Sequence, residues 1–299
     1  MGAIFGDYIT EGGNGRLERD RRFSMSVIAN NRFLQRTNPT MLAAIDDGGS
    51  VLDRVYIQNA ARQIVDQGHW SNLKFWGCAG LAEIDTRSSV DYVPKLYDLS
   101  GEGNDLIQAD NDKQPKWTSE GLDFDGSNDY LYKTTTASLT NIGALTYMGW
   151  FYLQKKSKTM CIFSISCVFA QHNVMLILNR SANNIFIYGR TTSGANVRPD
   201  AIEYTDNTFN HIAMTRNASG AHKFYFNGDD VSDNVRNEDG TIDLTTGEIG
   251  VGGRYLRDNN TADQLSEDFA NDLRIYNSVL TATEIAAIYD QTKSYYGIS

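Results

Sequence analysis

The pattern of apolar and polar positions changes character near residue 85. Beyond it, short segments alternate between apolar and polar residues and are separated by Gly, Asn, Asp and Ser, which is typical of β-strands joined by turns. The expected strands lie at residues 144–153, 160–170, 174–179, 184–190, 211–217, 222–231, 248–253 and 268–280. Many short strands in succession predict an antiparallel sandwich.

Two segments have helical spacing instead. In residues 50–70, apolar residues recur near a period of 3.6, with Ser50 and Gly68 as the expected caps. An isolated helix of this length is marginal, so its apolar face must pack on something. A second short helix is expected at residues 281–291, where Thr281 and Glu284 have the spacing of a capping box.

Residues 1–48 show neither pattern. The stretch "EGGNGRLERDRRF" is Gly-rich and then charged, which predicts an exposed arm. We therefore expect an N-terminal anchoring arm with one helix over residues 1–87 and a sandwich domain over residues 88–299. The arm has a basic patch that is either a solvated face or a docking contact for an acidic partner surface, formed by Arg16, Arg19, Arg21 and Arg22.

The net charge restricts the classes of partner that the protein is expected to bind. Lys and Arg number 27 against 37 Asp and Glu, giving a net charge of −10 over 299 residues, which argues against a nucleic-acid partner. Three cysteines without CxxC spacing predict reduced thiols and no zinc site. No apolar run has the length of a signal-peptide core or a membrane span, so we expect synthesis in a host cytoplasm and no membrane partner.

Three blocks of sequence carry a family resemblance. They are "YDLSGEGNDLIQADNDKQPKW" with "GLDFDGSNDYL" (97–131), "FNHIAMTRNASGAHKFYFNGDDV" (209–231) and "NDLRIYNSVLTATEIAAIY" (271–289). In this order they resemble concanavalin A-like sandwich domains of the laminin G and pentraxin type. The resemblance implies an all-β antiparallel sandwich, or jelly roll, with a short irregular and helical segment before it. It leaves function open, since this fold hosts lectins, glucanases, adhesive modules and toxin domains.

Two details of the second block refine the expectation. Asn227 and Gly228 supply the positive φ that a primed hairpin turn needs. Beside the turn, alternation places Phe224 on one face of the strand and Tyr225 on the other. Asn210 stands where the family usually has Trp, which we expect to cost some core packing.

The acidic residues in "GLDFDGSNDYL" have two interpretations. Asp125 caps a tight turn at Gly126, or the cluster contributes to a calcium site, since calcium takes six to eight oxygen ligands. In the family the first and last strands lie close together, which would bring Asp125 and Asn128 to Asp272. These three residues are the candidate ligands, and structural calcium is the cofactor that they suggest.

Catalytic motifs are missing from the sequence. Glycosidases of this fold carry paired carboxylates on one strand, but no Glu-x-Asp-x-x-Glu occurs, and "EIDTRS" (83–88) lacks the second Glu. No histidine has a recognisable Ser or Cys partner, and His211 is expected to be a packed residue. We therefore predict no catalytic residue and no enzyme activity.

Sugar binding is the alternative to catalysis for this fold, because sugars stack on aromatic rings and accept hydrogen bonds from Arg. Residues 188–198 and 252–260 are expected to be loops that contain both residue types. They are either ordinary loops or a carbohydrate-binding surface, with Tyr188, Arg190, Arg254, Tyr255 and Arg257 as the candidate residues.

Two functions fit these observations. The entry block (97–131) resembles those of phage fibre, tail and decoration proteins, so the first is a structural protein on the exterior of a tailed-phage virion. Its arm would dock on other virion proteins, its sandwich would face outward toward host or environmental glycans, and it would form a homo-oligomer. The second is a secreted or surface carbohydrate-binding module or a glycoside hydrolase of the same fold.

Overall fold

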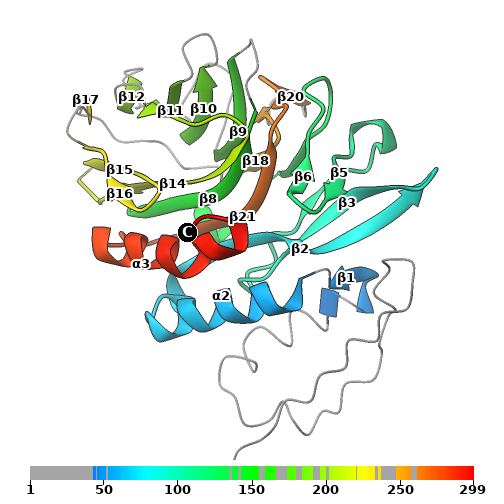
Figure 1. Ribbon diagram of the computed structural model, residues 1–299, viewed down its shortest axis with the longest axis horizontal. Coiled ribbons are helices and arrows are strands. Elements are labelled where there is room, and N and C mark those ends of the chain that lie inside the picture. The colour runs from blue at the N-terminus through cyan, green and yellow to red at the C-terminus, as the bar shows by residue number, and fades with distance from the viewer. Residues whose placement is uncertain are drawn as a thin grey trace, which may run out of the picture.

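The structure, a computed structural model, describes residues 43–299 except for positions 45, 52, 135–136, 141–142, 155–158, 166–173, 180–183, 191–195, 200–201, 220, 233–234, 237–246 and 257–260. Its main body is a sandwich of two antiparallel layers with two helices against the outer face of one layer (Figure 1). The predicted fold class, an all-β antiparallel sandwich, is confirmed.

The first layer places the earliest long strand beside the last one. Its order is β15 (His222–Phe226), β14 (Thr208–Arg216), β8 (Leu145–Leu153), β21 (Phe269–Tyr276), β2 (Leu73–Arg87) and β3 (Val90–Asp98). β21 therefore lies between β8 and β2 in the middle of this layer, and the β2–β3 hairpin extends beyond the rest of the sheet (Figure 1).

The second layer faces the first across the core. Its order is β4 (Leu106–Ile107), β7 (Leu131–Lys133), β18 (Ile249–Val251), β9 (Thr159–Ile165), β10 (Val174–Asn179) and β11 (Asn184–Arg190). β3 also pairs with β4, so hydrogen bonds join the two layers at one side.

Shorter elements complete the fold. The remaining strands are β1 (Gly49–Val51), β5 (Lys116–Thr118), β6 (Gly121–Asp123), β12 (Asn196–Pro199), β13 (Ile202–Glu203), β16 (Asp229–Asp230), β17 (Val235–Arg236), β19 (Arg254–Leu256) and β20 (Thr261–Asp263). The helices are α2 (Arg54–Asp66) and α3 (Ala282–Thr292), with 3-10 turns η2 (Trp70–Asn72), η3 (Asn111–Lys113), η4 (Ala137–Leu139) and η8 (Lys293–Tyr296).

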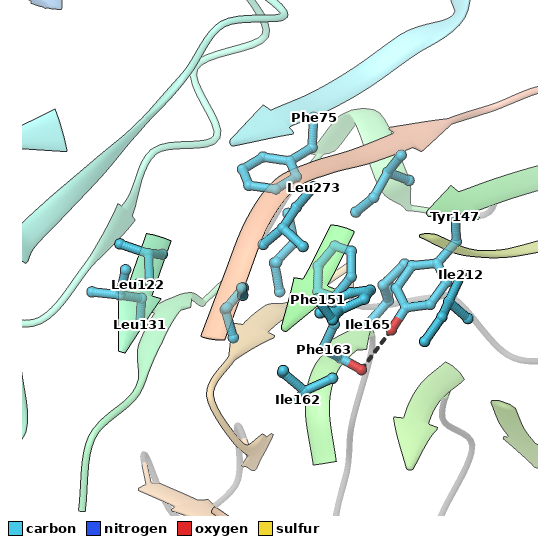
Figure 2. Close-up of a cluster of buried hydrophobic side chains, with 14 of the residues drawn as sticks. Phe75, Leu122, Leu131, Tyr147, Phe151, Ile162, Phe163, Ile165, Ile212 and Leu273 are labelled. Carbon is cyan, nitrogen blue, oxygen red and sulfur yellow. Dashed lines mark hydrogen bonds between the residues drawn. The ribbon is translucent and has the colours of Figure 1, made fainter. Parts of the chain in front are cut away.

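Alternation along the strands of the first layer divides the apolar residues between two cores. Tyr147 and Phe151 of β8 point into the core between the layers, whereas Met148 points to the helices. Figure 2 shows the inner core, where the Tyr147 hydroxyl donates a hydrogen bond to the carbonyl oxygen of Phe163 at 2.6 Å. On β15, Phe224 joins the inner core and Tyr225 the outer one, as the sequence predicts.

Local signals explain the turn and the helix ends. The predicted Asn-Gly hairpin is present, with φ of 51° at Asn227 and 87° at Gly228. The predicted capping box at α3 is confirmed, since Thr281 and Glu284 each bond the backbone N–H of the other. The cap of α2 differs from the prediction. Asp53, not Ser50, accepts from the backbone N–H of Tyr56 at 2.9 Å.

The predicted domain boundary at residue 87 requires correction. β2, within the expected arm, pairs with β21 and β3, and β1 pairs with β2. The apolar face of α2 packs on the first layer of the same chain, where Ile57 and Ile64 lie with Trp76 in the outer core. The described residues from 43 to 87 therefore belong to the sandwich, and this helix face is not free to dock on another chain. Arg16, Arg19, Arg21 and Arg22 lie outside the described residues.

Candidate functional site

The acidic residues of the entry block (97–131) stabilise a turn of the backbone. One carboxylate oxygen of Asp125 accepts from the backbone N–H groups of Ser127 at 2.8 Å, Asn128 at 3.1 Å and Asp129 at 3.3 Å. The Asn128 amide donates to the carbonyl oxygen of Asp112 at 2.7 Å. The turn-capping interpretation of Asp125 is thus confirmed.

The candidate calcium ligands are not brought together. Strand β6 does lie beside β21, and Gly126 lies against the side chain of Glu267. Asp272 is five residues further along, which is roughly 15 Å at the rise of a strand. Its oxygens already accept from Trp76, Tyr56 and Arg274, a donor set that does not fit a cation. Across the described part of the chain, no three His, Cys, Asp or Glu residues form a metal-binding group.

Asp129 is the acid of this block whose titration the fold changes most. Burial, together with the neighbouring Asp125 carboxylate, raises the pKa of Asp129 from 3.8 to about 7. The folded protein therefore holds this proton where the unfolded chain has released it. The contribution of Asp129 to the free energy of unfolding is therefore largest below pH 4 and decreases as the pH rises toward 7.

Asp129→Asn is expected to remove this pH dependence. Each pKa unit corresponds to about 1.4 kcal/mol, so we expect the variant to exceed the wild type by about 1–3 kcal/mol in the free energy of unfolding at pH 8, and by little at pH 4. Urea denaturation at the two pH values measures the difference. The same difference at both pH values would contradict the assigned titration.

Two of the candidate sugar-binding residues, Arg254 and Tyr255, do not form an exposed loop surface. Tyr255 is only 1% exposed, and its ring stacks on Tyr132 with 4.5 Å between the centroids. Arg254 is paired with Asp263. The prediction that Tyr255 and Arg254 present a loop surface is wrong, because β19 and β20 form a hairpin whose Tyr255 packs on the outer face of the second layer.

The other candidates for sugar binding have no described side chain. Tyr188 and Arg190 lie in strand β11 and not in a loop, opposite Met175 and Asn196. Arg257 lies outside the described residues. The prediction therefore stays untested for Tyr188, Arg190 and Arg257.

A buried ion pair lies under the helices instead. Asp272 and Arg274 project from β21 and are 2% and 1% exposed. One carboxylate oxygen accepts from the Trp76 indole at 2.7 Å and from Arg274 Nε at 2.9 Å, and the other accepts from Arg274 and the Tyr56 hydroxyl. Both charges in this group thus have an opposite partner, which a buried ion pair requires.

The ion pair fixes the protonation of its neighbours. Burial alone would lower the pKa of Arg274, but the Asp272 carboxylate raises it well above its usual value. Burial, and next the Asp272 charge, raise the pKa of Tyr56. His211, packed on Trp150 as expected of a core histidine, has its pKa lowered to about 3 by burial and by Arg274. His211 is therefore uncharged at neutral pH and adds no charge beside Asp272 and Arg274.

A polar pocket opens beside this pair, between α2 and the chain's last turns. Its volume is about 260 Å³. The lining residues, which we call the inter-helix pocket, are Tyr56, Asn59, Ala60, Arg62, Gln63, Asp66, Gln67, Gln291, Thr292 and Tyr295. Four of them are amides, and both aromatic ones are tyrosines, so the wall combines hydrogen-bonding groups with ring surface.

Tyr295 supplies the exposed ring of the pocket. It is 41% exposed, its ring lies edge-on to Tyr56 at 5.0 Å, and the Asn59 amide donates to its hydroxyl. A large aromatic side chain held in place at the rim of a polar pocket is a common platform for a ligand.

Gln63 and Gln67 supply unpaired polar atoms. Oε1 of Gln63 accepts from Arg274 at 3.3 Å, while its Nε2 has no hydrogen-bond partner among the described residues, and neither has Oε1 of Gln67. The sequence does contain a signal for this wall, because Asn59, Gln63 and Gln67 recur every four residues on one face of α2. The partner wall, from Gln291 to Tyr295, is brought there only by the fold.

The architecture is that of an antiparallel β-sandwich with two helices covering the outer face of one layer. The family model described as "Concanavalin A-like lectin/glucanases superfamily" matches residues 125–286, and the chain belongs to this family. The predicted resemblance is confirmed. A comparison with curated protein sequences finds no match.

Solved structures show the same fold at low sequence identity. The botulinum neurotoxin serotype D ligand binding domain, solved in complex with N-acetylneuraminic acid, is 12% identical with a TM-score of 0.56, over 78% of this chain and 55% of that one. The binding domain of Paraclostridial Mosquitocidal Protein 1 is 14% identical with a TM-score of 0.52, over 77% and 56%. The chain thus spans about half the length of these structures. Among the described helices, none has the length and apolar character to cross a membrane.

Proposed function

We propose that the protein is a non-catalytic glycan-binding protein and that the inter-helix pocket is its sugar site. The observation that carries this is the exposed Tyr295 ring beside a wall of amides, since protein sugar sites combine ring stacking with fixed hydrogen-bonding groups. The volume of about 260 Å³ is at the small end of ligand sites, which suits one sugar residue. A neighbour of the same fold, solved with N-acetylneuraminic acid, supports the ligand class.

Catalysis is not part of this proposal. Hydrolysis of a glycosidic bond needs two carboxylates that flank the bond, one of them free to donate a proton. The pocket is lined by a single carboxylate, that of Asp66, and the nearby Asp272 is held by Arg274, Trp76 and Tyr56. The pocket therefore has the groups that hold a sugar but lacks the pair that cleaves one.

Tyr295→Ala is expected to weaken glycan binding by about tenfold, because loss of a stacking contact costs about 1–1.5 kcal/mol. A glycan array followed by calorimetry on the best ligand measures this. Val55→Ala is the matched control, since Val55 is 62% exposed on α2, which forms one wall of the pocket, and does not itself line the pocket. Equal affinity in the two variants would place the sugar elsewhere. The same binding measurement in the presence of EDTA tests whether binding needs a metal.

We also propose that the protein belongs to the exterior of a tailed-phage particle, as a tail fibre, receptor-binding or head decoration protein. The support is the resemblance of the entry block (97–131) to those of such proteins. Because the α2 face is buried within the chain, docking on other virion proteins falls to the arginine patch of residues 16–22.

The particle assignment has its own test. Mass spectrometry of purified virions should find this chain at a fixed copy number, and an imaged particle should show it in symmetric positions, as expected of a homo-oligomer. Recovery only as free protein from culture medium would reject the virion role and favour a secreted carbohydrate-binding module.

A further inference from the structure

We propose that the inter-helix pocket binds the terminal residue of a glycan chain and excludes residues within the chain. This inference rests on the proposed glycan-binding function and specifies which part of a glycan the same site takes. It is carried by three features of the pocket: a contact between its two walls at each end, a closed floor, and a single exposed rim.

One end of the pocket is closed by the contact between Asn59 and Tyr295. The Asn59 amide of α2 donates a hydrogen bond to the Tyr295 hydroxyl of η8, so the contact crosses from one wall to the other. The Tyr295 ring also lies edge-on to Tyr56 of α2, with 5.0 Å between the centroids. A chain of sugar residues could not leave the pocket at this end without separating these side chains.

The two walls also meet beyond the other end of the pocket. Just after the end of α2, the His69 imidazole lies 2.9 Å from the carboxylate of Glu284, which belongs to the first turn of α3. Most lining residues fall between the two contacts along the chain, from Ala60 to Gln67 on one wall and at positions 291–292 on the other. The gap between the helices is therefore bounded at both ends.

The floor of the pocket is formed by buried side chains. Ala60, Gln63 and Thr292 line the pocket and are each less than 5% exposed. The Thr292 hydroxyl accepts a hydrogen bond from the Trp150 indole of β8 at 3.0 Å and donates one to the carbonyl oxygen of Ile288 at 2.6 Å. These bonds tie the floor to the first layer, so a ligand cannot pass through the pocket toward the sheet.

The remaining side of the pocket faces solvent. Its exposed lining residues, which form the rim, are Asn59, Arg62, Asp66, Gln291 and Tyr295. A sugar residue can enter only past this rim, and its links to further residues must leave past the same rim. A terminal residue has one such link, whereas a residue within a chain has two, at different positions of its ring. Steric exclusion of the second link is the expected source of selectivity.

Calorimetry on the full chain tests the proposal with cello-, laminari-, manno- and chito-oligosaccharides of increasing length, from disaccharide to hexasaccharide. In a series that binds, the affinity per chain is expected to change by less than about twofold with length, because each chain offers one suitable end. A methyl ether on the hydroxyl that would extend the non-reducing end, and borohydride reduction of the reducing end, identify which end enters. One of the two modifications is expected to weaken binding by about tenfold or more.

Asn59→Ala tests whether the contact with Tyr295 sets this selectivity. Opening that end is expected to let longer chains make additional contacts, which would raise the ratio of hexasaccharide to disaccharide affinity by about threefold. Val55→Ala, on the same helix but outside the lining, should leave the ratio unchanged. The same ratio in Asn59→Ala as in the wild type would overturn the role of this contact as a wall. A melting curve for each variant controls for folding.

The outcomes separate this inference from the glycan-binding function. Affinity that rises with chain length, ignores both end modifications and is lost in Tyr295→Ala would overturn the selectivity for a terminal residue and leave the pocket as a glycan site. End-dependent binding that Tyr295→Ala does not affect would overturn the pocket assignment and leave glycan binding. If no series binds, the end modifications are made on the best ligand of the glycan array. Binding of no glycan at all would reject both proposals.

Discussion

Arg274→Met is expected to lower the free energy of unfolding by about 3–5 kcal/mol. The substitution leaves the Asp272 carboxylate buried at the centre of the first layer with no opposite charge, and only the Trp76 indole and the Tyr56 hydroxyl still donate to it. Urea denaturation, followed by circular dichroism, measures the loss.

A double variant identifies the cause of that loss. Asp272→Asn combined with Arg274→Met removes both charges but keeps an acceptor for Trp76 and Tyr56, and asparagine tolerates the positive φ of 34° at this position. We expect it to recover at least half of the lost stability. If the double variant is as unstable as Arg274→Met, the loss comes from packing and not from the unpaired charge. Lys113→Met, at an exposed ion pair, should have little effect.

Asp98→Asn is the second substitution with a large expected effect. Both carboxylate oxygens of Asp98 are used: one accepts from the backbone N–H groups of Trp76 at 3.0 Å and Ser100 at 2.9 Å, the other from the Ser100 hydroxyl at 2.8 Å and the backbone N–H of Asn104 at 2.9 Å. An amide replaces one of these oxygens by a donor, so at least one backbone N–H group would face an N–H group even if the Ser100 hydroxyl rotates to accept. We expect a loss of about 2–4 kcal/mol.

Asp105→Asn provides the comparison for Asp98. Asp105 accepts a single backbone hydrogen bond, from the N–H of Asp98 at 2.8 Å, which an asparagine oxygen can also accept. Thermal melts of the two variants, with hydrogen exchange over residues 98–104, should show loosening of this loop in Asp98→Asn alone. Equal behaviour would mean that the Asp98 carboxylate does not hold the loop.

The strands that could be predicted from the sequence alternate between apolar and polar residues or are rich in aromatic and β-branched residues. β8, β10, β11 and β21 lie within the expected ranges, and the Asn227-Gly228 turn and the α3 cap rest on interactions between near neighbours in the chain. β2 escaped prediction for a physical reason. Phe75 lies in the inner core and Trp76 in the outer core, so most of the strand is buried on both faces and shows no alternation.

The residues of the candidate site were harder to predict from the sequence than the fold. The family resemblance indicated the fold correctly, but the polar residues that make the entry block recognisable, such as Asp98 and Asp125, hold loops through hydrogen bonds within the chain. Tyr255 looked like a loop residue because the sequence does not show that its hairpin folds back on the sheet. The inter-helix pocket needs residues from both ends of the described chain, and no local pattern joins Gln63 to Tyr295.

The adjacency of β2 and β21 constrains how the molecule acquires its structure. Trp76 and Asp272, which are hydrogen-bonded at the centre of the first layer, are separated by 196 positions in the chain. A contact of such long range forms only after a large loop has closed, and topologies dominated by contacts of this kind fold slowly. During synthesis on the ribosome, α2 and β2 emerge early. They stay uncovered until β21, which pairs with β2, has also emerged. Until then their apolar surfaces are open to chaperones and to other nascent copies.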